Sequence, residues 1–122
     1  MRMLLFLLAL VAAPAWAGWD KLVEADGWTL YVDTASLRMN GNFRRIWQME
    51  DLKQRAKDGE MSRRTLMEYD CKDERARSIS TASFSGPMLN GQTLRWSDDP
   101  SKWMAIPPGT FADIFLKATC AI

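Results

Sequence analysis

Histidine is absent from the 122-residue sequence, and several other features are scarce. Without histidine the chain has no imidazole to serve as a metal ligand, a triad base or a proton shuttle near neutral pH. Its two cysteines are too few for a four-cysteine zinc site. Sixteen Lys and Arg residues against fifteen Asp and Glu residues leave a net charge of +1, which removes the electrostatic basis for nucleic-acid binding. The sequence therefore predicts no nucleic-acid partner, no metal and no cofactor.

Long hydrophobic runs are also missing, except at the N-terminus. Arg2 supplies a positive start, residues 3–13 are apolar, and residues 15–17 (AWA) have the small-x-small form that signal peptidase recognises. This run is shorter than the roughly 20 residues needed to span a bilayer. We therefore expect residues 1–17 to be a cleaved signal peptide, without a transmembrane anchor. Residues 18–122 would then form a single exported domain that is periplasmic, displayed on the outer surface or secreted.

Export determines how the two cysteines are interpreted. In an oxidising compartment, two cysteines in a small chain are most often joined as a structural bridge. Neither Cys71 nor Cys120 belongs to a C-x-x-C motif, which would indicate a redox role. The sequence therefore predicts a structural Cys71–Cys120 disulfide.

Alternating segments separated by turn residues predict an antiparallel sheet. Asp26-Gly27 is a strong hairpin signal between the first two strands. In the fourth strand Met67, Tyr69 and Cys71 share one face, which we expect to be covered. Six strands are expected, at residues 19–24, 28–32, 43–51, 63–71, 75–85 and 93–96.

Two segments connect the predicted strands on either side of the third one. Residues 33–38 are predicted to form a turn or a single helical turn capped by Asp33, and residues 53–60 a polar loop. Alternation in the third strand separates two sets of side chains. Phe43, Trp47 and Met49 lie on one face, and Arg44, Gln48 and Glu50 lie on the other.

A C-terminal helix is predicted over residues 111–118, with Thr110 as its N-cap. Its apolar stripe consists of Phe111, Ile114, Phe115 and Ala118, spaced as for core packing. Cys120 would lie opposite this stripe, so we expect the helix to end before it. The predicted fold is α+β: a single antiparallel sheet of about six strands, with a C-terminal helix packed on its Cys71 face and tethered by the disulfide.

Several short motifs occur along the chain in an ordered set. They are Tyr31-Val32-Asp33-x-x-Ser36-Leu37-Arg38, Glu68-Tyr69-Asp70-Cys71-Lys72 with Arg75 and Arg77, Ser85-Gly86-Pro87-Met88, Asp99-Pro100-Ser101-x-Trp103, and Pro108-Gly109-Thr110 leading to Cys120. In this order they resemble the bacterial surface-adhesin E (protein E-like) family. The resemblance implies the same sheet-and-helix fold with its cysteine pair. It also implies a small exported protein with a macromolecular partner, since some relatives bind host matrix or plasma proteins.

Two groups of residues are candidates for binding such a partner. A basic group would suit an acidic polysaccharide or an acidic protein surface, and it consists of Lys53, Arg55, Lys57, Arg63 and Arg64. Acidic residues are interleaved with it, so a solvated hairpin is the alternative interpretation. Trp96 and Trp103 bracket a turn and would form a docking surface if exposed, although burial of both is the alternative. An open sheet edge or face would also allow a homodimer.

Catalysis has little support in the sequence. Asp70, Asp98 and Asp99 are the carboxylates that a small periplasmic hydrolase would use, but adjacent acids on a strand point to opposite faces. Asp98 and Asp99 precede a proline and favour a turn. We therefore expect a non-enzymatic envelope protein that binds a macromolecule. A periplasmic interaction or inhibitor module is the alternative, and a carboxylate-based hydrolase is a remote one.

Overall fold

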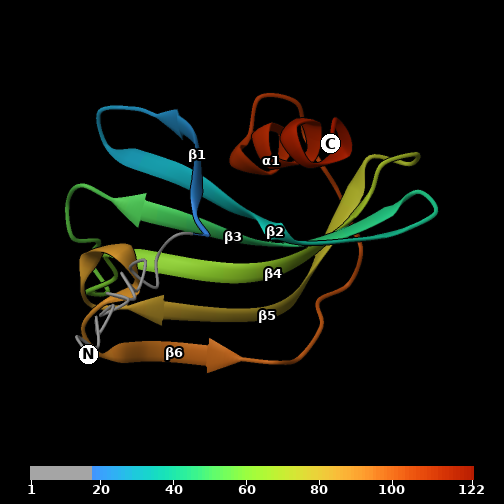
Figure 1. Cartoon of the computed structure of the whole chain (residues 1–122). Coiled ribbons are helices and arrows are strands. Elements are labelled where there is room, and N and C mark those ends of the chain that lie inside the picture. Colours follow the sequence, from blue (N-terminus) through green and yellow to red (C-terminus); the bar gives the residue numbers. More distant parts are fainter. Residues whose placement is uncertain (1–17) are drawn as a thin grey trace, which may run out of the picture.

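The computed structural model describes residues 18–122, so the predicted signal peptide lies outside the described residues. It contains a seven-stranded antiparallel sheet, in which β1 to β6 lie side by side in chain order (Figure 1) and β7 pairs with β5. The strands are β1 (Asp20–Glu24), β2 (Trp28–Asn40), β3 (Phe43–Leu52), β4 (Ser62–Asp70), β5 (Arg75–Phe84), β6 (Thr93–Ser97) and β7 (Met104–Ala105). A 3-10 turn, η1 (Pro87–Leu89), follows β5, and α1 (Phe111–Cys120) ends the chain. Within this part of the chain no helix is long and apolar enough to cross a bilayer.

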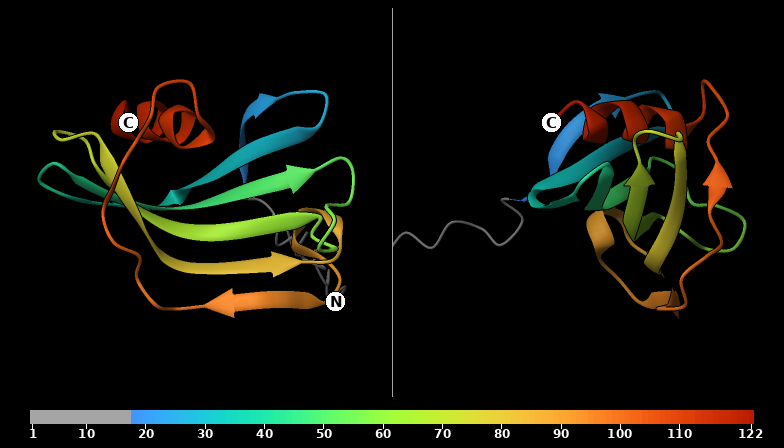
Figure 2. Two further views of the ribbon diagram at one scale, coloured as in Figure 1. Left: turned by 180° about the vertical axis from the view of Figure 1, so that it is seen from behind. Right: turned by 90° about the vertical axis from the view of Figure 1, so that its right-hand side faces the viewer.

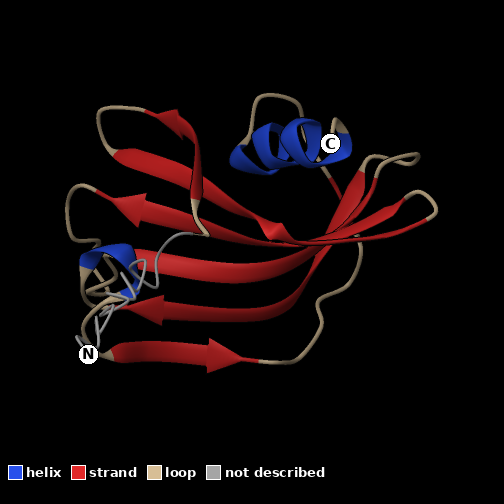
Figure 3. Cartoon of the chain, viewed as in Figure 1, coloured by secondary structure: helices blue, strands red, loops and turns tan. Residues whose placement is uncertain are grey.

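Helix α1 packs on one face of the sheet and contacts β3 and β4 (Figure 3). The side chains buried between them include Leu30, Ile46, Tyr69, Phe115 and Leu116. The Cys71–Cys120 disulfide joins the end of α1 to the turn after β4. The predicted fold class, the covered Tyr69 face and the bridge are therefore confirmed.

The prediction for residues 33–38 is wrong, because β2 continues through them as a strand. The pairing of β2 with β3 becomes irregular between Asp33 and Arg38. At this irregularity the Ser36 hydroxyl donates to the Asp33 carbonyl at 2.7 Å and accepts the Trp47 N–H at 3.0 Å. A side chain thus replaces a missing ladder bond, and the turn-forming residues sit in a bulge.

The predicted end of the helix is also wrong, because α1 continues through Cys120. Its buried side chains include Phe115, Leu116 and Thr119, so the buried stripe is rotated from the predicted one. At about 100° per residue, Cys120 lies beside this stripe and not opposite it. The prediction for Thr110 is confirmed, since its side chain accepts the Asp113 N–H at 3.3 Å.

Alternation in β3 holds as predicted, but the core residue on the helix side is Ile46. Strand register places Phe43, Trp47 and Met49 on the opposite face. Part of that face is covered by the chain that leads from β6 to α1, where Trp103 packs on Phe43 with ring centroids 5.8 Å apart.

Candidate functional site

Helix α1 covers only part of the face on which it packs, where it contacts β3 and β4. Both views in Figure 2 show α1 and β6 at opposite ends of the molecule. Between them lie two adjoining hollows of about 350 and 580 Å³, which both include Arg63 and Thr81 in their walls. We call them together the open groove. Its lining residues are Gln48, Glu50, Arg63, Thr65, Met67, Tyr69, Ser78, Thr81, Ser83, Arg95, Trp96, Ser97, Phe111, Ala112 and Phe115.

The floor of the open groove is polar because of how the strands are aligned. Glu50 on β3 pairs with Arg63 on β4, Arg63 with Ser83 on β5, and Ser83 with Arg95 on β6. The four side chains therefore form one row across the sheet. A parallel row contains Gln48, Thr65, Thr81 and Ser97. Phe111 and Phe115 of α1 border these rows on one side.

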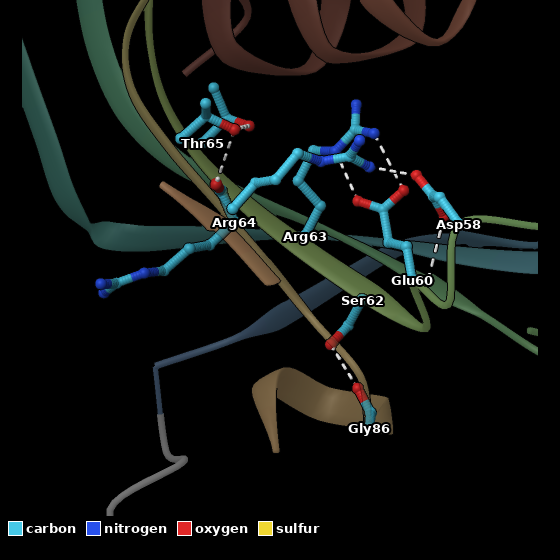
Figure 4. A network of polar contacts seen from close by, with 9 residues as sticks. Asp58, Glu60, Ser62, Arg63, Arg64, Thr65 and Gly86 are labelled. Carbon is cyan, nitrogen blue, oxygen red and sulfur yellow. Dashed lines mark hydrogen bonds and ion pairs between the residues drawn. The ribbon is translucent and has the colours of Figure 1, made fainter. Parts of the chain in front are cut away.

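The row through Arg63 belongs to a cluster of charges. Arg63 pairs with Glu60, with its Nε 2.7 Å from Oε1 and a terminal nitrogen 2.9 Å from Oε2. Arg95 pairs with Asp58. Figure 4 shows Arg63 pointing toward Glu60 and Asp58. Together with Glu50, the cluster contains three carboxylates and two guanidinium groups.

Glu50 is the carboxylate of this cluster without an ion pair of its own. No Lys or Arg side chain in residues 18–122 lies within salt-bridge distance of it, because Arg63 is directed to Glu60. Burial raises the pKa of Glu50; the Arg63 charge lowers it in part, and the nearby Glu60 raises it further. Glu50 is half-buried, and a carboxylate that loses part of its hydration without an ion pair is costly in the folded protein.

A second unsatisfied group lies in the same row. The Ser83 side chain is only 4% exposed, and its hydroxyl has no hydrogen-bond partner in the described part of the chain. The neighbouring row is better satisfied: the Tyr69 hydroxyl donates to Gln48, and burial raises the pKa of Tyr69. The groove therefore contains a hydrogen-bonded pair, Tyr69 and Gln48, beside two groups without a partner of their own. These are the Glu50 carboxylate and the Ser83 hydroxyl.

The five predicted basic residues do not form one patch. Lys53 pairs with Glu24 at 3.2 Å, and Arg55 donates to the carbonyls of Gly59 and Ser85 at 3.0 and 2.7 Å. Lys57 is exposed in the loop between β3 and β4.

Arg63 and Arg64 point to opposite faces of β4, as Figure 4 shows. Arg63 lies in the open groove, while the Arg64 guanidinium stacks over Trp47, 5.2 Å from the ring centroid. Close by, the buried Ser62 hydroxyl donates to the Gly86 carbonyl at 2.7 Å and fixes the loop that follows β5.

The two candidate tryptophans differ in exposure. Trp96, on edge strand β6, is 65% exposed. Trp103 is half-buried, because Phe43 packs on it and the guanidinium groups of Arg75 and Arg77 lie 4.8 and 4.9 Å from its ring centroid. Trp96 alone of this pair presents a large open aromatic surface.

The candidate carboxylates of the hydrolase hypothesis support turns. Asp70 pairs with Arg75 at 2.9 Å and accepts the backbone N–H groups of Lys72 and Asp73 at 3.2 Å. Asp98 accepts a hydrogen bond from Ser80 at 2.6 Å. The Asp99 N–H donates to the Ser97 hydroxyl at 3.2 Å. Among the described residues, no three acidic or cysteine side chains are grouped to hold a metal ion.

Comparisons with known proteins place the chain in a structural context. The sequence model described as Surface-adhesin protein E matches residues 19–121. A search of curated proteins gives no match. Crystal form II of Haemophilus influenzae protein E is 15% identical with a TM-score of 0.64, covering 86% of this chain and 88% of that one. Protein E from non-typeable Haemophilus influenzae is 14% identical with a TM-score of 0.55, covering 86% and 76%. At these identities the two structures show a shared fold.

Proposed function

The chain belongs to the surface-adhesin protein E family, and from this premise we propose that it is an exported, non-enzymatic protein that binds another protein. The binding surface is the open groove together with the adjoining edge strand β6. Family membership supports an adhesive role, and the disulfide fits an extracytoplasmic location. Host matrix and plasma proteins are the partners that we propose to test first.

The observation that carries this proposal is the half-covered sheet. If the whole face of the sheet were a hydrophobic core, α1 would have to cover all of it. Instead, strands β4 to β6 form a polar floor beside α1. On β6, Trp96 and Leu94 are exposed at the edge of the sheet. Exposed aromatic side chains dominate the energetics of protein interfaces, and an unpaired edge strand can receive an extended segment.

The first experiment measures binding of the purified protein to immobilised host matrix and plasma proteins. We expect Trp96→Ala to weaken a detected interaction at least tenfold, because a tryptophan at an interface hot spot contributes about 2 kcal/mol or more. Met39→Ala is the matched control, since Met39 is 62% exposed and lies in the β2–β3 hairpin, away from β6. Equal binding by Trp96→Ala and the wild-type protein would contradict the proposed surface.

Location separates the adhesin hypothesis from its alternative. Protease added to intact cells should cleave a displayed protein, while a soluble periplasmic protein serves as the leakage control. Full protection, with release by osmotic shock, would overturn surface adhesion. It would favour the periplasmic interaction or inhibitor module, and the same Trp96 variant would then be tested on periplasmic partners.

A further inference from the structure

The charge cluster at the open groove is short of one cation. Three carboxylates, Glu50, Glu60 and Asp58, are matched by two guanidinium groups, those of Arg63 and Arg95. Glu50 is half-buried, and carboxylates that are partly withdrawn from water are normally paired. The carboxylate that lacks an ion pair, Glu50, lines the wall of the 350 Å³ hollow.

The rest of this hollow is suited to a long side chain with a charged end. Phe111 and Phe115 of α1, together with Met67 of β4, give one part of it apolar walls. The hydroxyls of Thr65 and Thr81 lie 3.4 Å apart on its floor. A lysine or arginine side chain packs its aliphatic stem on apolar surface and keeps its charged head among acceptors.

The adjoining hollow supplies a second, independent observation. The Ser83 hydroxyl is buried in the same cross-strand row as Glu50 and has no partner in residues 18–122. A buried hydroxyl without a partner costs free energy. The polar floor of the groove is therefore not fully satisfied by the protein's own groups.

We propose that the open groove binds a lysine or arginine side chain of the partner protein, with the Glu50 carboxylate as its ion-pair acceptor. This inference rests on the proposed function and names the chemistry of the partner. The groove therefore selects a cationic protein segment and not an acidic one, although Arg63 and Arg95 also line it, because their charges are already matched by Glu60 and Asp58.

The test titrates the protein with three blocked tripeptides that have glycine on each side of lysine, arginine or norleucine. Amide chemical shifts in two-dimensional NMR report the site. We expect the lysine or the arginine peptide to shift the signals of Thr65 and Thr81 at millimolar concentration. Glu50→Gln should weaken this binding at least tenfold. Glu74→Gln, an exposed acid in the β4–β5 turn, is the charge-matched control and should bind as the wild-type protein does.

Three results would overturn the inference: equal shifts with the norleucine peptide, unchanged binding by Glu50→Gln, or cationic-peptide shifts confined to residues outside the groove. Its failure can be told apart from failure of the proposed function. A protein ligand whose capture depends on Trp96 but is unaffected by Glu50→Gln would leave the binding function standing and remove the cation site.

Discussion

At the scale of single residues, Glu50 shows how a binding group can act against the stability of its own fold. Burial raises the pKa of its carboxyl, with Glu60 adding to the effect and Arg63 opposing it. The folded protein therefore binds a proton at Glu50 more readily than the unfolded chain does. Stability contributed by this group is lost as the pH rises from its unfolded pKa through its raised folded pKa.

The corresponding prediction concerns Glu50→Gln in the absence of ligand. At pH 7 the substitution should increase the free energy of unfolding, because it removes a desolvated charge. Each unit of pKa difference is worth about 1.4 kcal/mol. At pH 4, below the ordinary value of 4.5 for glutamate, the gain should disappear. Urea denaturation of both proteins at the two pH values measures the difference.

The control for this comparison is Glu74→Gln, at an exposed position where we expect a change within about 0.5 kcal/mol at both pH values. A loss of stability in Glu50→Gln at pH 7 would mean that the folded protein already stabilises this carboxylate. A bound cation would have little to add in that case.

At the scale of elements, the strands were predictable wherever side chains alternate, as in β4. The extension of β2 was not, because Asp33 and Ser36 are residues that favour turns. Their side chains act here within a sheet, where the Ser36 hydroxyl bridges Asp33 and Trp47. That contact joins two strands and leaves no local pattern in the sequence.

The buried stripe of helix α1 differs from the predicted one. An apolar stripe was predicted from apolar residues only, so Thr119 was left out although it is fully buried. Including Thr119 and Leu116 rotates the stripe toward Cys120, which explains how the helix reaches the disulfide without ending early.

The N-terminus of α1 carries the prediction at this scale. Thr110→Ala should lower the free energy of unfolding by about 1 kcal/mol, because the Asp113 N–H loses its acceptor. Asp113 itself accepts the Gly109 N–H at 3.0 Å and the Lys117 ammonium at 3.0 Å, which keeps part of the cap in place. Thr110→Ser retains the hydroxyl and should stay near wild type in urea denaturation. An equal loss in both variants would exclude the hydroxyl as the source.

At the scale of the whole molecule, the candidate site could not be predicted from any single segment. The sequence suggests a basic patch between Lys53 and Arg64. In the structure its residues are divided between the β3–β4 loop and the two faces of β4. The row Glu50, Arg63, Ser83 and Arg95 depends on the register of four strands. This row remains open because α1 packs on a neighbouring part of the same face.

The position of α1 is held by the Cys71–Cys120 bridge, so the last prediction concerns its removal. A variant with both Cys71→Ser and Cys120→Ser should lose about 4 kcal/mol of unfolding free energy in the chain-entropy model, given the sequence separation of 49 residues. Replacing both cysteines avoids an exposed thiol that could join two molecules. Urea denaturation should show a lower midpoint, and reduction of the wild-type protein should reproduce it.

Hydrogen exchange of the double variant should show the amides of α1 losing protection before those of β3 and β4, because the bridge no longer holds α1. Helix α1 forms one wall of the open groove, so this loss would affect the groove as well. Equal midpoints for the oxidised wild-type protein and the double variant would show that apolar packing alone positions α1 and the groove beside it.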